Sequence, residues 1–330
     1  MEIQEYQLAD ARGQHRMNRY LPWALFFSGI YMVLGGYLKA DTARFPDLLN
    51  YGRSFNDFSL YGWYYDFGGL SLIFSEPVWG LIVLVASVYL DDPELLYFCV
   101  SLISILVIAT FVLVHSNSPA LLIFLLNPLI IDLVFSQIRS ALALSLLLCA
   151  VMHSKGRLVG VILVTLACLI HTSMIVLIGI YVAAKLISRI RMPSGSLIRF
   201  GMVLFVALVV ALVLSFGREA LLTGVEDRRA IYLNSSSSIM YLGFWSCAAL
   251  ILLFSRLITG VYKSSWMVFF VAIFFFTSFF MGLAGVNGTR FVSLSIPLFI
   301  VTISFCEPRR RLPLFSSLFG FQLIQYAYWV

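Results

Sequence analysis

The stretch LVGVILVTLACLIHTSMIVLIGIYVAA, residues 158–184, decides the fold of this chain. It is apolar except for a polar centre, His171 to Ser173, and it lies between Arg157 and Lys185. Basic residues that flank apolar segments mark the cytoplasmic side of a membrane. Because both ends are then on one side, the stretch must form a helical hairpin. Each arm has only about 13 residues, fewer than the ~17–25 that cross a bilayer core, so the apex lies near the outer membrane face.

The composition extends this conclusion to the whole chain. Of the 330 residues, 61% are hydrophobic and 12% are charged, whereas a soluble domain has roughly 25% charged residues. The five cysteines are scattered through apolar stretches and predict neither disulfides nor a zinc site. The net charge of +6 comes mostly from residues that flank apolar segments, so nucleic acid is not an expected partner. We expect an all-α, polytopic integral membrane protein.

Charge and length together predict the topology. Residues 1–20 are expected to be a cytoplasmic tail, and residues 21–330 a single transmembrane domain. The run 77–90 is too short for a full span and is followed by acidic residues, so we expect a re-entrant or interfacial segment on the outer side. About eleven transmembrane helices remain, with the N-terminus inside and the C-terminus outside. The outer loops are then residues 39–94, which include the re-entrant segment, and 137–138, 171–173, 217–238 and 285–289.

Basic residues on the outer side are the unusual feature of this topology. Eight of the 22 Lys and Arg residues fall there, where the positive-inside rule makes them scarce. Arg139 and Arg290 lead directly into apolar helices, and a guanidinium binds phosphate through two hydrogen bonds. Both are therefore candidates for binding a phosphate or pyrophosphate group. The alternatives are snorkelling to lipid headgroups or pairing with Glu76 or Asp41.

Two further outer-face residues are candidates for catalysis, because ionisable groups at membrane depth are costly and usually functional. His171 stands at the hairpin apex, although it could instead bond a backbone carbonyl left open by the turn. Glu76 stands directly before Pro77 and could instead cap a helix N-terminus. The sequence contains no HExxH, CxxC, GxSxG or Walker motif. We therefore expect no metal and no cofactor at the site.

The first outer loop is rich in aromatic residues. Tyr51, Trp63 and Tyr65 could pack on the C–H faces of sugars and bond their hydroxyls, and Asp41 precedes them. The alternative is an interfacial belt of aromatic side chains. These four residues are the candidate glycan-binding positions.

Three motifs resemble the central signature of the EpsG/Wzy-like polysaccharide polymerases. They are SQIRSALA at 136–143, the basic turn at 154–157 and LIHTS at 169–173. The stretch 41–51, SEPVW at 75–79 and TRF at 289–291 resemble the flanking elements of that family. Members of the family make O-antigen (a part of lipopolysaccharide), capsule or exopolysaccharide.

The resemblance implies a glycosyltransferase-type polymerase of the bacterial inner membrane. Its substrates would be oligosaccharide repeat units on undecaprenyl pyrophosphate, joined at the outer face, which is the periplasmic or exterior side. His171, Glu76 and Arg139 would be catalytic, and Arg139 and Arg290 would bind the pyrophosphate. Membrane lipids and a chain-length regulator protein are the other expected partners. An O-antigen ligase or another enzyme on lipid-linked glycans, a transporter or flippase, and a structural subunit are the alternatives.

Overall fold

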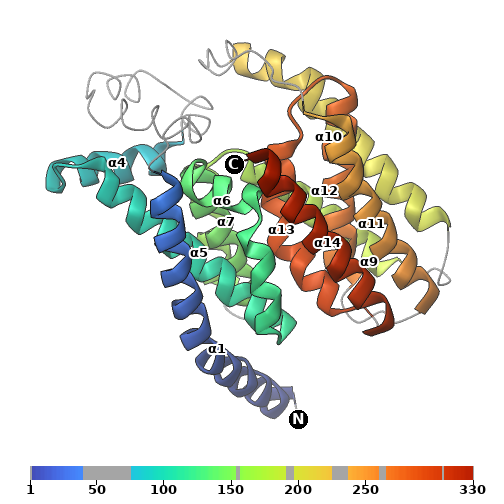
Figure 1. The fold of residues 1–330 in the computed structure, drawn as a ribbon, viewed down its shortest axis with the longest axis horizontal. Coiled ribbons are helices and arrows are strands. Elements are labelled where there is room, and N and C mark those ends of the chain that lie inside the picture. The colour runs from blue at the N-terminus through green and yellow to red at the C-terminus, as the bar shows by residue number, and fades with distance from the viewer. Residues whose placement is uncertain are drawn as a thin grey trace.

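The computed structural model describes residues 2–39, 76–153, 157–190, 197–224, 237–259, 265–306 and 308–329. All regular structure within these ranges is helical, which confirms the expected all-α class. The helices, shown in Figure 1, are α1 (Glu2–Lys39), α4 (Pro77–Tyr89), α5 (Pro93–Ser116), the 3-10 helix η3 (Pro119–Leu126), α6 (Pro128–Phe135), α7 (Ile138–Met152), α8 (Arg157–Ile170), α9 (Met174–Arg189), α10 (Leu197–Gly224), α11 (Ile239–Thr259), α12 (Ser265–Leu283), α13 (Thr289–Ser304) and α14 (Pro308–Trp329).

The two arms predicted from residues 158–184 are present and are joined by a short turn, although α8 packs mainly on α7 and α9 mainly on α12. Helix α8 ends at Ile170 and α9 begins at Met174, so the turn comprises residues 171–173. The expected first span, in contrast, extends further towards the N-terminus than the apolar run does, because α1 is helical from Glu2.

Several helices begin at a proline. Pro77, Pro93, Pro119 and Pro128 each stand at the first helical position, where the missing N–H removes no intrahelical bond and the fixed φ suits a helix. Asn127 adds a cap, because its side chain accepts a hydrogen bond from the N–H of the residue two positions on.

The apolar run 119–135 does not form a single straight helix. It is divided at Asn127 into η3 and α6, and α6 and α7 are bent by 101° relative to each other at Ser136 and Gln137. A residue before proline avoids the α conformation, and this explains the break at Asn127.

The core lies around α5, α12 and α13. Helix α12 packs against α9, α10, α11 and α13, while α5 packs against α1, α7 and α13. Phe111, Phe274, Phe275 and Phe299 are among the largest fully buried side chains. Because α13 contacts both α5 and α12, it joins the two halves of the bundle.

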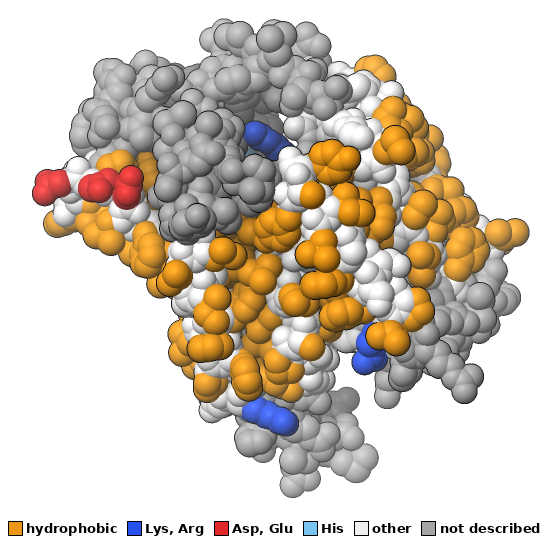
Figure 2. Space-filling view, viewed as in Figure 1, with side chains coloured by type: hydrophobic (Ala, Val, Ile, Leu, Met, Phe, Trp, Pro, Cys, Tyr) orange, Lys and Arg blue, Asp and Glu red, His pale blue; other side chains and the backbone are white. Residues whose placement is uncertain are grey.

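The outer surface is suited to lipid. Figure 2 shows hydrophobic side chains spread over the middle of the visible face, and α8 and α10 expose many aliphatic residues. Only 22% of the most apolar window of α10 is buried, against 78% for α12. Helix α10 therefore faces lipid and α12 is the interior helix.

By length and composition, three of the described helices can each cross a membrane: Pro93–Ser116, Leu197–Gly217 and Trp266–Leu283. The bent pair α6 and α7 makes a fourth if it is taken as one broken span. The count of eleven spans stays a prediction. Helix α4 has only 13 residues and runs crosswise to α1 at the upper left of Figure 1, the orientation expected of an interfacial or re-entrant segment.

Candidate active site

Glu76 is the centre of the site and has an unusual backbone. It immediately precedes α4, with φ 59° and ψ 55° in the left-handed region, and its side chain is only 3% exposed. This conformation costs a residue with a Cβ about 1–2 kcal/mol. The side chain makes no capping bond to α4, so the helix-cap interpretation of Glu76 is wrong. Such strain persists only when the surroundings impose it, and it is concentrated at functional sites.

Arg139 reaches this carboxylate from a different helix. It is the second residue of α7, which begins directly after the corner at Ser136 and Gln137. One guanidinium N–H donates to Oε2 of Glu76. The arginine side chain is 27% exposed, so it is partly accessible while it holds the carboxylate.

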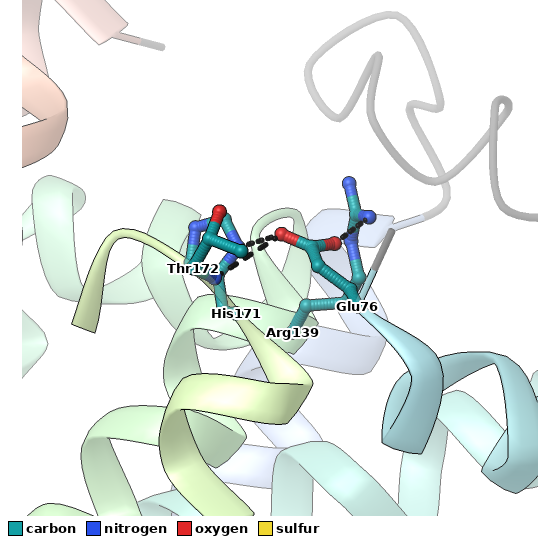
Figure 3. Close-up of polar contacts among 4 residues, drawn as sticks. All are labelled: Glu76, Arg139, His171 and Thr172. Atoms are coloured by element: carbon teal, nitrogen blue, oxygen red, sulfur yellow. Dashed lines mark hydrogen bonds and ion pairs between the residues drawn. The ribbon is translucent and has the colours of Figure 1, made fainter. Parts of the chain in front are cut away.

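His171 binds the second oxygen of the same carboxylate. Its Nδ1 lies 2.6 Å from Oε1 of Glu76, and the backbone N–H of Thr172 lies 3.4 Å from the same oxygen. The turn between α8 and α9 therefore contributes both a side chain and a main-chain donor. Figure 3 shows the carboxylate between the imidazole on one side and the guanidinium on the other.

This arrangement determines what each group can do. A carboxylate paired with a guanidinium only accepts hydrogen bonds, so the proton of the Glu76–His171 contact belongs to Nδ1. The remaining nitrogen, Nε2, is then the basic atom. A base oriented by a third group is the arrangement used to deprotonate a hydroxyl nucleophile, and the neighbouring guanidinium can stabilise an anion.

The comparison with protein families identifies the chain. The EpsG family model matches residues 19–330. The chain belongs to the EpsG family. No curated protein and no solved structure matches it. The family match covers nearly the whole chain and includes Glu76, Arg139 and His171, and it supports a role like that of a polysaccharide polymerase.

Arg290 of this EpsG family member lies on another helix, as the exposed second residue of α13. The preceding turn is held by Asn287, whose Oδ1 accepts hydrogen bonds from the Ser237 hydroxyl and from Thr289. A Cβ at Gly288 would lie 2.3 Å from the backbone oxygen of Ser278 on α12, so the start of α13 packs directly on that helix. The turn lies at the same end of the bundle as the start of α4 (Figure 1).

Four predicted residues lie outside the described part of the EpsG chain: Asp41, Tyr51, Trp63 and Tyr65. Their assignment to glycan binding stays a prediction. Within the described ranges, no group of three or more His, Cys, Asp or Glu side chains is placed to hold a metal ion.

Asp132 and Gln137 were missed by the sequence analysis as members of this region. Gln137 stands two residues before Arg139, and its side-chain Nε2 donates to Oδ2 of Asp132 at 2.6 Å. A signal was present, because Asp132 is the only charged residue in the apolar run 119–135.

Proposed function

We propose that this EpsG family protein joins oligosaccharide repeat units carried on undecaprenyl pyrophosphate at the outer face of the bacterial inner membrane. The product would be an O-antigen, capsule or exopolysaccharide. The observation that carries the proposal is one buried carboxylate, Glu76, that holds both Arg139 and His171. The site thus places a base that can deprotonate a hydroxyl, His171, beside a cation that can bind a phosphate, Arg139, in a chain of the EpsG family.

The base acts on the acceptor. In the proposed step, Nε2 of His171 takes the proton of an acceptor sugar hydroxyl, and the oxygen attacks the anomeric carbon of the donor glycan. Glu76 stabilises the imidazolium that forms, because its carboxylate stays bonded to the Nδ1–H. The nucleophile thus gains strength without an external base.

The arginine acts on the leaving group. The bond between the anomeric carbon and the pyrophosphate oxygen breaks, and the electron pair leaves with the undecaprenyl pyrophosphate. The accessible part of the Arg139 guanidinium binds the charge that develops there, and Arg290 contributes a second cation. Pyrophosphate is an activated leaving group, so the proposed reaction uses neither ATP nor a metal.

The remaining contacts of the substrate are assigned by chemistry. The lipid chain would lie against the apolar surface of the bundle, and the glycan against Asp41, Tyr51, Trp63 and Tyr65. A chain-length regulator protein would act on the length of the product.

The test is reconstitution of the purified protein in vesicles with a synthetic lipid-linked repeat unit and excess chelator. We expect a ladder of products that differ by one repeat unit, and release of free undecaprenyl pyrophosphate. The His171→Ala variant should lose the ladder, while His153→Ala, which changes an exposed histidine at the far end of α7, should keep it. Transbilayer movement of the lipid without new glycosidic bonds, or activity that returns only with added divalent ions, would overturn the proposal.

A further inference from the structure

The corner between α6 and α7 contains a carboxylate that the proposed chemistry does not use. Asp132 is half-buried in α6, within a run that is otherwise uncharged. A charged side chain in such a segment is costly, and it is retained where it has a function. Directly after α6, the chain bends by 101° into α7.

Asp132 binds the corner through its side chain and its main chain. Oδ2 accepts the hydrogen bond from Nε2 of Gln137 at 2.6 Å. The backbone carbonyl of Asp132 accepts from the N–H groups of Ser136 and Gln137, at 2.8 and 3.0 Å. Non-helical backbone at membrane depth is tolerated only where the protein satisfies its polar groups. Asp132 therefore holds both residues of the corner.

The corner in turn determines where Arg139 lies. Gln137 is buried and directly precedes α7, and its carbonyl accepts the N–H of Ala141 in the first turn. Each residue of an α-helix turns the chain by roughly 100°, since one turn takes 3.6 residues. A rotation at Gln137 would therefore swing the Arg139 guanidinium away from Glu76.

We propose that Asp132 and Gln137 are positioning residues for the glycosyl transfer. Their hydrogen bond fixes the start of α7 and so the contact of Arg139 with Glu76, and neither residue touches the substrate. The inference rests on the proposed function. It requires a hydrogen bond between the side chains of residues 132 and 137 and does not require that the charge be on residue 132.

The experiment exchanges the two partners. Asp132→Asn keeps an oxygen that can accept from Gln137. Gln137→Glu places two carboxylates together, which removes the donor and adds repulsion. The double variant Asp132→Asn with Gln137→Glu restores an amide–carboxylate bond with donor and acceptor reversed. Gln137→Met removes the donor without a new charge, and it replaces Gln137→Glu if that variant does not fold.

The readout is the initial rate of polymerisation by the purified variants, as kcat and KM. We expect Gln137→Glu or Gln137→Met to lower kcat about 10- to 100-fold, Asp132→Asn to lower it only a few-fold, and the double variant to recover to within about fivefold of the parent protein. An inactive Asp132→Asn that the second change does not rescue would show that the charge of residue 132 is needed, and it would overturn the proposal. Full activity of the single Gln137 variants would also overturn it.

A second measurement needs no substrate. Thermal unfolding in detergent is compared for Gln137→Met, Arg139→Met and the double variant. If Gln137 positions Arg139, the double variant melts close to the less stable single variant, because both changes remove the same contact. Additive shifts in melting temperature would overturn the positioning role. This result stands even if the protein polymerises no glycan, so failure of the proposed function is distinguishable from failure of the inference.

Discussion

Glu76 combines a strained backbone with a side chain that two separate elements bind at the same time. Its left-handed conformation directs the carboxylate away from α4 and towards Arg139 and His171. An unstrained residue before Pro77 would be extended. The contacts with Arg139 and His171 therefore offset the energetic cost of the left-handed backbone. Mutation can separate the cost of the backbone from the contribution of the contacts.

We expect Glu76→Gly to be more stable than Glu76→Ala by about 1 kcal/mol. Both variants lose the carboxylate, but only glycine adopts positive φ without a steric cost. Ser173 is the matched control, because its φ of −60° and ψ of −17° are right-handed. At that position the alanine variant should be the more stable one, by about 0.5–1 kcal/mol. If the two Glu76 variants were equally stable in thermal or denaturant unfolding, the backbone at residue 76 would not be strained.

The geometry of Arg139 leads to a second prediction, on rate. Lysine keeps the charge but loses the planar fork, so Arg139→Lys should hold neither the Glu76 carboxylate nor the pyrophosphate properly. Loss of one such interaction costs about 2–4 kcal/mol of transition-state stabilisation, or roughly 30- to 1000-fold in rate. Turnover and chain length are measured at matched expression. Arg290→Lys should show the same effect.

Arg157→Lys provides the control for this series. Arg157 begins α8 and is exposed at the end opposite the His171 turn, so its lysine variant should polymerise normally. Near-normal polymer from Arg139→Lys would instead mean that residue 139 acts only through its charge, as a snorkelling or topological residue does.

At the scale of elements, α14 supports the broken segment that leads to the site. Eight residues is long for a 3-10 helix, and its carbonyls need partners at membrane depth. The Gln322 amide donates to the carbonyl of Ile123 at 3.2 Å, and the Tyr326 hydroxyl donates to the carbonyl of Leu126. The Asn127 amide donates to Gln325 at 2.5 Å. One face of α14 thus provides hydrogen-bond partners for two carbonyls of η3 and for the side chain of Asn127, where η3 meets α6.

Removal of one of these donors should destabilise the protein measurably. We expect Tyr326→Phe to lose about 0.5–2 kcal/mol, the range for a hydrogen bond within a membrane protein. Tyr328 is 90% exposed on the same helix, so Tyr328→Phe should leave thermal stability unchanged. Equal melting temperatures for the two variants would mean that the α14 contact contributes nothing.

The sequence was sufficient for some of these elements and not for others. The flanking charges and the length of each arm were enough to predict the turn between α8 and α9. The positive-inside rule also predicted that Arg139 lies on the same side of the membrane as this turn. The side chain of Glu76 could not be placed, because a residue before proline gives no sign of a left-handed backbone. The corner after α6 was not evident either, because it depends on hydrogen bonds that Asp132 accepts, and one acidic residue hardly changes the apolar pattern of residues 119–135.

At the scale of the whole molecule, the two termini lie at opposite ends. The start of α1 and the end of α14 are separated along the bundle in Figure 1, as the predicted odd number of crossings requires. As the predicted interfacial or re-entrant segment, α4 would add none. Arg157 and Arg189 stand at the ends of α8 and α9 away from His171. These two basic residues, which the positive-inside rule places in the cytoplasm, are therefore remote from the site.

This arrangement predicts which residues a membrane-impermeant thiol reagent reaches in intact cells. Single cysteines are introduced at the exposed positions Asp92, Ser238 and His153, in a variant with the five native cysteines replaced by serine. Asp92→Cys and Ser238→Cys should be labelled from outside, since they follow α4 and precede α11 at the end that holds the site. His153→Cys, at the far end of α7, should react only after the membrane is permeabilised. A cytoplasmic Asp92 would make α4 a full crossing and place both Arg139 and His171 on the side of the membrane opposite Glu76, which their contacts with Glu76 do not allow.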